Sequence, residues 1–521
     1  MKTFDHLPAS SWRRSALAAL AGALPVLAFP EPSLWWFAYV ALVPWIVLIR
    51  SAPTGRRAAY DGWSGGFGFM LAMHHWLVPS LHVFTFVIAA LLGALWAPWG
   101  ALVRHFLAGT PPRARVAGAL LVLPSGWLLV ELVRSWQGLG GPWGVLGASQ
   151  WEVEPALRLA SVGGVWLISF LVVVVNVAVA VLVTVRRSRV PALAGLLATA
   201  AVTSAAWMWS PRPHPDGQVR IAVVQAGVID GPDRRFAREE ALTRRLAGQG
   251  VDLVVWGESS VGFDLGERRD LARRLAGLSA EAGADILVNV DARRSDKPGI
   301  YKSSVLVGPD GLTGDRYDKM RLVPFGEYIP FRSLLGWATS VGKAAGEDRR
   351  NGSEQVVMDV GNGLRVGPMV CFESAFPDMS RHLADSGAQV LIAQSSTSSF
   401  QHSWAPEQHA SLAALRAAEM GRPMVHATLT GVSAVYGAEG QRVGSWLGTD
   451  ASTTAVYQVP LATGVTPYVR FGDWVTRVAL LVVAGWCAGQ GLRALRLRRA
   501  APEPRVPPAR TAHGSPARPG R

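Results

Sequence analysis

The sequence predicts an α-helical integral membrane bundle of about eight spans with one α/β domain inserted before the last span. Three observations predict this fold class. Half of the 521 residues are hydrophobic and the mean hydropathy is +0.23, which is too apolar for an ordinary soluble chain. Apolar segments of roughly bilayer length recur along the N-terminal part and once more near the C-terminus. Between them lies a polar stretch of about 250 residues in which strand and helix patterns alternate.

Seven of the apolar segments precede the polar stretch and one follows it. The first and third are short or rich in glycine, so their ends are the least well defined. A cleaved signal peptide is the alternative for the first segment, but no clear small-residue cleavage site follows Pro30. The eight predicted spans are 15–29, 34–49, 62–78, 83–107, 116–133, 160–185, 190–209 and 474–495.

The loops between these segments alternate in charge. Basic residues are concentrated before the first span and in every second loop, and the other loops contain few of them. Because cytoplasmic loops carry the excess of Lys and Arg, we expect both termini in the cytoplasm and the polar stretch outside it. The basic residues are Lys2, Arg13 and Arg14, then Arg50, Arg56 and Arg57, then Arg104, Arg113 and Arg115, then Arg186, Arg187 and Arg189, and after the last span Arg493, Arg496, Arg498 and Arg499.

The net charge of +14 does not indicate nucleic-acid binding. Residues 217–467 contain 26 basic and 28 acidic side chains, so the basic excess belongs to the membrane loops and the C-terminal tail. The tail is rich in Pro, Arg and Ala and is expected to be disordered cytoplasmic chain. The predicted organisation is a membrane domain at 1–212, an extracytoplasmic domain at 217–467, a final span at 470–497 and the tail at 498–521.

The polar stretch predicts a two-layer sheet with helices outside. Its strand-like runs are bounded by Gly, Pro or Asp, and helical patterns lie between several of them. The turns 309–311 and 437–440 predict hairpins, so the sheet should be mixed. The predicted strands are 219–225, 251–256, 285–290, 303–307, 364–371, 389–394, 424–428 and 432–436, and the predicted helices are 233–247, 266–282, 378–386 and 405–420.

Cys371 is the only cysteine of the polar stretch. The other cysteine, Cys487, lies in the final apolar segment, so the two are not expected to pair. Glu258, Lys319 and Cys371 each follow a predicted strand or hairpin. Because the carboxyl ends of sheet strands meet at one edge, we expect these side chains to converge there. A carboxylate can accept the proton of a thiol and an ammonium can hold an oxyanion, so the set predicts a nucleophilic site.

Taken singly, these residues have plainer interpretations: a packed cysteine, a helix-capping glutamate and a solvated lysine. Their surroundings argue against this. The motifs W-G-E-S-S around Glu258, Y-D-K-M-R-L-V-P-F-G-E-Y around Lys319 and V-C-F-E-S around Cys371 together resemble the Glu-Lys-Cys signature of the nitrilase superfamily. With seven spans before the domain and one after it, the chain is similar in particular to the membrane-embedded apolipoprotein N-acyltransferase branch. The resemblance runs from 67–76 through 141–150 to the last span and implies a nitrilase-like α-β-β-α sandwich.

The resemblance implies a role for each matching residue. Glu258 would be the general base, Lys319 the oxyanion stabiliser and Cys371 the nucleophile. Glu327 and Glu373 match further acidic positions, whose expected work is to orient the lysine and the cysteine. The remaining expected site residues are Phe372, which supports the nucleophile, and Trp256, Tyr328, Trp337 and Trp404, which contact substrate or form a lid.

The resemblance also implies a reaction and its partners. A fatty acyl chain would pass from a membrane phospholipid, through a thioester on Cys371, to the α-amino group of the S-diacylglyceryl-cysteine at the N-terminus of an apolipoprotein. Two substrates that use one cysteine in turn give ping-pong behaviour, and no metal or other cofactor is required. The expected location is the bacterial inner membrane.

Two rival interpretations stay open. A membrane-tethered amidase or nitrilase would use the same three residues but deliver water to the thioester. A catalytically silent membrane scaffold would keep the fold without the chemistry. The second is motivated by the stretch 394–400, which reads Q-S-S-T-S-S-F where many family members carry Asn-Asp-x-Trp-Phe. Trp404, just downstream, is the candidate to replace the missing aromatic side chain.

Overall fold

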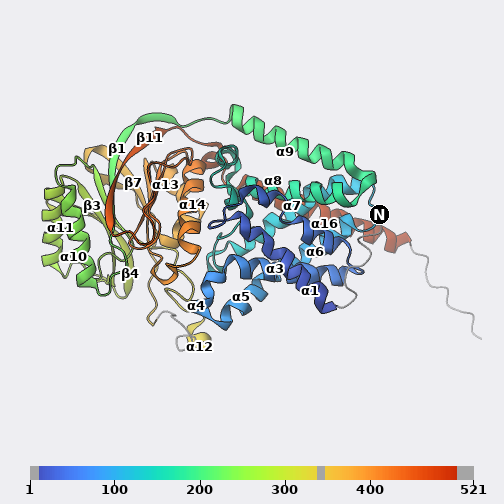
Figure 1. Cartoon of the computed structure of the whole chain (residues 1–521), viewed down its shortest axis with the longest axis horizontal. Helices are drawn as coiled ribbons and strands as arrows, with labels where there is room; N and C mark the ends of the chain where they lie inside the picture. The colour runs from blue at the N-terminus through green and yellow to red at the C-terminus, as the bar shows by residue number, and fades with distance from the viewer. Residues whose placement is uncertain (1–10, 337–345, 501–521) are drawn as a thin grey trace, which may run out of the picture.

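The computed structural model describes residues 11–336 and 346–500. They form an all-helical half and an α/β half that lie side by side, and the final helix returns from the second to the first (Figure 1). A helical region combined with an α/β domain is therefore confirmed. The helical half contains α1 (Ser11–Ala23), α2 (Val43–Arg50), α3 (Gly55–Met73), α4 (Val78–Leu81), α5 (Val83–Gly93), α6 (Trp96–Leu107), α7 (Arg113–Arg134), α8 (Glu154–Thr184), α9 (Arg189–Trp209) and α16 (Trp474–Ala500).

Four helices among the described residues are long and apolar enough to cross a membrane. They are α7, α8, the stretch Arg186–Trp209 that contains α9, and Trp474–Leu497 of α16. Helices α5 and α6, bent by 41° relative to each other, would make a fifth if they form one span. The first three predicted spans are less regular, because α1 has 13 residues, α2 has eight, and α3 ends at Met73. Length and composition thus support the later spans, and the count of eight is not shown.

Helix α3 packs closely against α1, α5 and α6. A Cβ atom on Gly66 would lie 2.4 Å from the carbonyl oxygen of Gly93 in α5, and one on Gly68 would lie 1.9 Å from that of Ala19 in α1. Only glycine permits such close approach of two helix backbones. The glycine content that blurs the third predicted span is therefore a packing feature.

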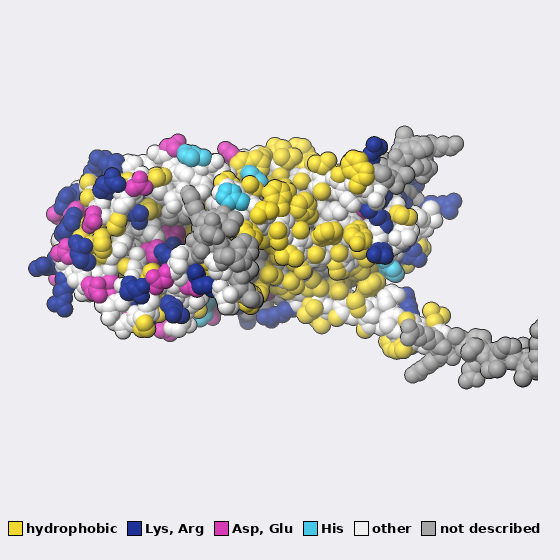
Figure 2. All heavy atoms as spheres, turned by 90° about the horizontal axis from the view of Figure 1, so that it is seen from below, with side chains coloured by type: hydrophobic (Ala, Val, Ile, Leu, Met, Phe, Trp, Pro, Cys, Tyr) yellow, Lys and Arg dark blue, Asp and Glu magenta, His cyan; other side chains and the backbone are white. Residues whose placement is uncertain are grey.

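The surfaces of the two halves differ in character (Figure 2). Hydrophobic side chains cover the helical half almost continuously, whereas Lys, Arg, Asp and Glu are interspersed over the α/β half. Helices α9 and α16 contribute strongly exposed apolar side chains, for example Leu197, Met208 and Leu481. An apolar surface of this extent is typical of a membrane or partner contact and not of a surface that faces water.

The α/β half contains two mixed sheets packed face to face. In hydrogen-bonding order the first is β11-β1-β2-β3-β4-β5 and the second is β10-β9-β8-β7-β6. In each sheet three neighbouring strands run parallel, and antiparallel strands are added at the edges. The strands are β1 (His214–Gln225), β2 (Leu253–Trp256), β3 (Asp285–Arg293), β4 (Ile300–Gly308), β5 (Gly311–Asp318), β6 (Met358–Val360), β7 (Leu364–Val370), β8 (Val390–Ser395), β9 (Met424–Thr428), β10 (Ala434–Tyr436) and β11 (Thr453–Thr463).

All eight predicted strands are present, and the turn predicted at 309–311 joins β4 to β5. The sequence patterns missed β5, β6 and β11. Strand β11 contains Pro460, which argues against an interior strand, and it does lie at the edge of the first sheet beside β1. Strand β6 has only three residues, too few for a pattern to emerge.

The core of the α/β half lies between its sheets, where side chains such as Ile221, Val255, Val366 and Ile392 pack together. Two helices cover the outer face of the first sheet and two cover the second. This is the α-β-β-α sandwich that the resemblance implied. The helices are α10 (Pro232–Thr243), α11 (Arg269–Ala282), α13 (Pro377–Asp385) and α14 (Ala405–Met420), and the short α12 (Arg332–Leu335) and α15 (Pro467–Phe471) lie in connections.

Helix α14 joins the two halves. Fifteen of its 16 residues are buried, because one face packs on the second sheet and another on α8. The side chain of Gln408 donates to the carbonyl oxygen of Pro30 and accepts from the indole N–H of Trp143. Glu419 accepts a 2.7 Å hydrogen bond from the backbone N–H of Val165 in α8. The second sheet is thereby fixed against the helical half.

Candidate active site

Cys371 occupies a sharp turn at the end of β7. Its φ angle is 52°, in the left-handed region that residues other than glycine rarely adopt. Its carbonyl oxygen accepts a hydrogen bond from Ser374 Oγ at 2.9 Å and lies 3.1 Å from Nε2 of His409 in α14. These contacts hold the turn in its strained conformation, with the side chain of Cys371 only partly buried.

Two buried carboxylates and a buried lysine lie at the same edge. Glu258 follows β2, Lys319 follows β5, and Glu327 lies in the loop beyond. Lys319 Nζ is 3.3 Å from Oε1 of Glu258 and 2.8 Å from Oε1 of Glu327. Burial removes the screening by water, so these charges interact strongly with one another and with the thiol of Cys371.

A second lysine, Lys302, was not predicted from the sequence. Together with Glu258, Glu327 and Lys319 it forms the charge cluster of this site. Lys302 lies in β4, and its Nζ is 2.8 Å from Oε1 of Glu258 and 2.9 Å from Oε1 of Glu327. The predicted strand began one residue too late to include it. The sequence did contain one indication of this position. In a strand, residues 302 and 306 lie on the same face, and Leu306 belongs to the core between the sheets. A charged side chain on a buried face requires partners.

Backbone strain is concentrated around the charge cluster. Six non-glycine residues in the described part of the chain have a positive φ, and three of them border the site. They are Ser259 after Glu258, Phe325 before Glu327, and Cys371 itself. Each such residue costs on the order of 1–3 kcal/mol and persists only where the surrounding structure imposes it, which is common at active sites.

The thiol and the nearest carboxylate have opposite protonation preferences. Burial raises the pKa of Cys371 to about 12; the charge of Glu258 adds to this, and both lysines oppose it. Burial also favours the neutral form of Glu258, but the charges of Lys302 and Lys319 outweigh it and lower the pKa of that carboxyl. At neutral pH the resting site therefore holds a thiol beside a carboxylate.

Lys319 and Glu327 form an ion pair in which both side chains are charged at neutral pH. Burial disfavours both charges, but the neighbouring carboxylates raise the pKa of Lys319 and the two lysines lower the pKa of Glu327 to about 2. The second oxygen of Glu327, Oε2, accepts a 2.8 Å hydrogen bond from the backbone N–H of Val323. Lys319 is thus held in place by a carboxylate that is itself anchored.

Glu373 ties the segment around Lys319 to the turn around Cys371. It is fully buried and accepts four hydrogen bonds from donors on both segments, two of them in buried and two in part-buried positions. Its Oε1 accepts from the hydroxyl of Tyr317 at 2.7 Å and the backbone N–H groups of Met320 at 2.7 Å and Arg321 at 3.0 Å, and its Oε2 accepts from the N–H of Val370 at 2.8 Å.

Replacing Glu373 by alanine should lower the stability of the α/β half by several kcal/mol, because each buried donor left without an acceptor costs about 1–3 kcal/mol. Glu373→Gln keeps one acceptor oxygen and should fall between alanine and the wild type. Thermal unfolding of the purified protein measures the difference. Glu354→Ala, which removes an exposed carboxylate, is the control. Equal unfolding temperatures for Glu373→Ala and the control would contradict this role.

The divergent stretch 394–400 begins with a structural residue. Gln394 donates to the carbonyl oxygens of Trp256 at 2.8 Å and Leu287 at 3.1 Å, and it accepts from the hydroxyl of Ser304 at 2.5 Å. Gln394 belongs to the second sheet and its three partners to the first. Its side chain therefore bridges the sheets next to the charge cluster.

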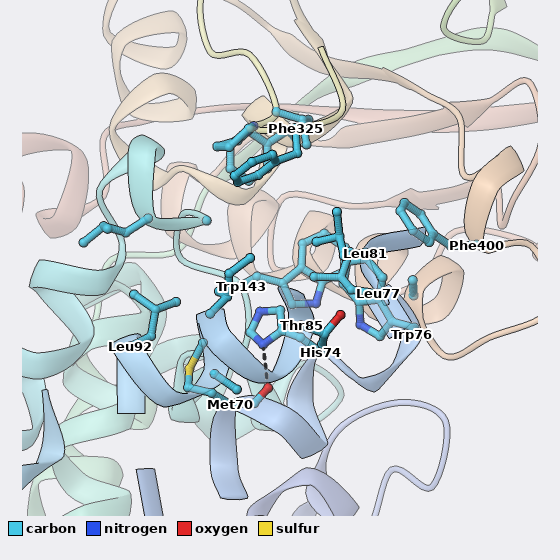
Figure 3. Close-up of a pocket in the computed structure, with 18 of the residues that line it drawn as sticks. Met70, His74, Trp76, Leu77, Leu81, Thr85, Leu92, Trp143, Phe325 and Phe400 are labelled. Atoms are coloured by element: carbon cyan, nitrogen blue, oxygen red, sulfur yellow. Dashed lines mark hydrogen bonds between the residues drawn. The ribbon is translucent and has the colours of Figure 1, made fainter. Parts of the chain in front are cut away.

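An apolar cavity opens beside the thiol. It has a volume of about 310 Å³ and extends from Cys371 to helices α3, α4 and α5 of the helical half. In Figure 3, Phe325 enters it from the α/β half, opposite Met70, His74 and Leu92 of the helical half. Most of the lining is aliphatic or aromatic, so the cavity suits an apolar ligand.

Two of the predicted supporting and substrate residues have clear positions. Phe372 lines the cavity next to Cys371. Trp256 does not, because it is fully buried on the other face of the first sheet, where it packs against Phe236 and donates to Thr243. The expectation that Trp256 contacts substrate is wrong.

Tyr328 and Trp404 lie close to the cavity without being among its lining residues. The carbonyl oxygen of Tyr328 accepts from the N–H of Phe325, and it is Phe325 that reaches the cavity. Trp404 packs edge-on against His75, with ring centroids 4.8 Å apart. The aromatic side chain that the divergent stretch presents to the cavity is Phe400, so the assignment of that place to Trp404 is corrected. Trp337 lies outside the described residues.

The sandwich and its Glu-Lys-Cys cluster define a domain of the carbon-nitrogen hydrolase class. The family model for carbon-nitrogen hydrolases matches residues 220–466, and the model for the apolipoprotein N-acyltransferase N-terminal domain matches residues 21–178. Among solved structures, an amidase from Nesterenkonia sp. is similar, with 20% identity and a TM-score of 0.36, over 48% of this chain and 92% of that one.

Relatives that match nearly the whole chain identify the family. The apolipoprotein N-acyltransferase of Azotobacter vinelandii is 31% identical over 95% of this chain and 98% of its own length. That of Geobacter metallireducens is 28% identical over 93% of this chain and 96% of its own. The chain belongs to the apolipoprotein N-acyltransferase family. This membership confirms the resemblance seen in the sequence and the prediction of an acyltransferase.

Proposed function

We propose that this protein transfers a fatty acyl chain from a membrane phospholipid, through a thioester on Cys371, to the α-amino group of the S-diacylglyceryl-cysteine of apolipoproteins. The observation that carries the proposal is the apolar cavity that connects the thiol with helices α3 to α5. Burial of a hydrocarbon chain there would contribute about 0.8 kcal/mol for each CH₂ group. An amidase for small polar amides has no use for such a cavity.

The first half-reaction acylates the enzyme. Glu258 accepts the thiol proton as Sγ of Cys371 bonds to the ester carbonyl carbon. Lys319 has three N–H donors and directs two at carboxylates, so the third is available to the oxyanion. When the intermediate collapses, the carbon–oxygen bond to glycerol breaks and Glu258 returns its proton to the departing oxygen. A thioester and a lysophospholipid result.

The second half-reaction acylates the lipoprotein. The free α-amino group attacks the thioester carbonyl carbon, Glu258 accepts an amine proton, and Lys319 again holds the oxyanion. The carbon–sulfur bond then breaks and the thiolate of Cys371 recovers the proton from Glu258. Glu327 and Glu373 orient the lysine and the cysteine, and Phe372 borders the acyl chain. Because both substrates use one cysteine, they react in turn.

We also propose that the helical half lies in the bacterial inner membrane, with the α/β half on the extracytoplasmic side and both termini in the cytoplasm. Eight spans, domain limits at 1–212, 217–467 and 470–497, and a cytoplasmic tail at 498–521 belong to this proposal. The hydrophobic surface of the helical half in Figure 2 and the basic residues of alternate loops support this arrangement. Helix α16 also ends on the side of the helical half away from the sandwich, as this topology requires (Figure 1).

Intact-mass spectrometry of the purified full-length protein after incubation with phospholipid vesicles tests the proposal. We expect a mass gain of one acyl chain, located on Cys371 by peptide mapping. Addition of a diacylglyceryl lipopeptide should remove that mass from the enzyme and add it to the peptide. A hydrolase would release free fatty acid and leave the peptide unmodified, and a silent scaffold would never gain the mass.

A bulky residue in the cavity should change the acyl preference. Ala89 of α5 is buried and lines the cavity, so Ala89→Phe is expected to slow adduct formation from long-chain donors by about tenfold and to spare short-chain donors. Val87→Phe adds bulk to the same helix at an exposed position and is the matched control. A uniform loss with all donors in Ala89→Phe would contradict an acyl site there.

A further inference from the structure

Two buried lysines bridge the same pair of carboxylate oxygens. Lys302 Nζ lies 2.8 Å from Oε1 of Glu258 and 2.9 Å from Oε1 of Glu327. Lys319 Nζ lies 3.3 Å and 2.8 Å from these same two atoms. The four charges form a closed ring in which each ion has two partners of opposite sign. The proposed reaction assigns a role to Lys319 only, so Lys302 requires an explanation.

The site, counted as the ring together with the reacting groups, has no net charge either before or after the proton transfer of the proposed reaction. In the resting state two ammonium groups face two carboxylates beside a neutral thiol. After attack, Glu258 is neutral and the oxyanion supplies the missing negative charge. Without Lys302 the site would carry one net negative charge in both states, and an uncompensated buried charge is costly.

The other charges around Lys302 leave this balance unchanged. Asp291 of β3 lies 3.9 Å from Lys302 Nζ and is itself paired with Arg349 at 3.3 Å. This pair contributes no net charge. Only 13% of the Lys302 side chain is exposed, so water screens its charge little.

Removal of Lys302 would leave Glu258 and Glu327 sharing one ammonium group. Two carboxylates so close together do not both ionise readily, and one of them would hold a proton to higher pH. Glu327 has the shorter contact with Lys319 and a backbone donor from Val323, so Glu258 would be the one to protonate. A protonated Glu258 cannot accept the proton of the Cys371 thiol.

We propose that Lys302 is a positioning residue of the acyl-transfer site: it keeps Glu258 ionised, and so able to accept the thiol proton, at mildly acidic pH. This inference rests on the proposed function, in which Glu258 is the base. With Lys302, strand β4 contributes a residue to the reactive site, in addition to Glu258, Lys319 and Cys371.

The test is the pH profile of acyl-adduct formation on Cys371, followed by intact mass in single turnovers with vesicles of phosphatidylethanolamine and phosphatidylglycerol. Lys302→Met should move the acid limb of the profile to higher pH by about one to two pH units. On the acid limb, at pH values below the pKa of Glu258 in both proteins, the rate should fall about ten- to a hundredfold, and at neutral and alkaline pH it should approach the wild-type rate. Lys302→Arg, which keeps the charge, should keep the limb near its wild-type position.

Two further variants serve as a control and as a test of charge compensation. Lys297→Met is the matched control, because Lys297 is partly exposed and pairs with Asp318, outside the ring; its profile should match the wild type. The double variant Lys302→Met/Glu327→Gln removes one charge of each sign and should return the acid limb toward its wild-type position. If Lys302→Met does not fold, Lys302→Gln replaces it in both comparisons.

The outcomes separate this inference from the proposed function. A wild-type protein that never forms the adduct overturns the proposed function itself. A wild-type protein that does form it, combined with a Lys302→Met rate lowered equally at every pH, overturns the role of Lys302 alone. The same holds if the acid limb of the double variant stays where Lys302→Met has it.

Discussion

Replacing Cys371 by alanine is expected to abolish the acyl adduct and to lower N-acylation of a diacylglyceryl lipopeptide by roughly 10⁴-fold or more, because the covalent route is lost with the nucleophile. Cys371→Ser should be equally inactive. A serine hydroxyl is a much weaker acid than a thiol, and Glu258 is a weak base because two lysines lower its pKa. Intact mass reports the adduct, and mass spectrometry of the peptide reports the transfer.

The control for this prediction is the other cysteine. Cys487 lies in α16 and is exposed, so Cys487→Ala should retain full adduct formation. The Cys371 variants should also fold, because Ser374 and His409 contact the backbone carbonyl of residue 371 and not its side chain. An acyl adduct that persists on another residue of Cys371→Ala, with transfer intact, would refute the thioester route.

The sequence predicted part of this site because part of it follows a simple rule. Glu258 and Lys319 each lie within two residues of the end of a strand, and the convergence of strand ends at one edge of a sheet brings their side chains within 3.3 Å of each other. Lys302 reaches the same edge from the start of β4, because β4 runs antiparallel to β3 and pairs Lys302 with Asp291. Its position depends on strand direction, which no local pattern reveals.

Trp256 illustrates a second limit of the sequence. Strand β2 is apolar on both faces, so its residues show no alternation from which a face could be assigned. Val255 points into the core between the sheets, whereas Trp256 points to the helices outside them. A side chain two positions before Glu258 therefore lies on the far side of the sheet from the cavity.

The cavity could not be predicted from the sequence, because it depends on how segments far apart in the chain pack together. Its walls come from α3, α4 and α5 in one half and from loops around Phe325 and Phe400 in the other. These segments meet only because α14 is buried between the second sheet and α8. The sequence contained the nucleophile and its charged partners, whereas the apolar route from them to the helical half depends on how the two halves dock.

Replacing Lys319 by methionine should slow adduct formation by roughly 10²–10³-fold, the usual cost of losing one oxyanion donor. Lys319→Met and Lys302→Met each remove one positive charge from the same two carboxylate oxygens, so both should raise the pKa of Glu258 above its lowered wild-type value. The rate of adduct formation measured across pH distinguishes the two lysines. Lys302→Met should recover once Glu258 ionises at higher pH, whereas Lys319→Met should not.

This contrast follows from the geometry of the donors. In Lys319→Met, Lys302 still faces Glu258 and Glu327, but the N–H that holds the oxyanion is gone at every pH. Lys319→Arg should recover little, because Lys319 is fully buried between two carboxylates and a planar guanidinium group presents its donors in a different geometry from an ammonium group. Recovery of Lys319→Met at high pH would mean that Lys319 acts only on the ionisation of Glu258, and the oxyanion would then require a different donor.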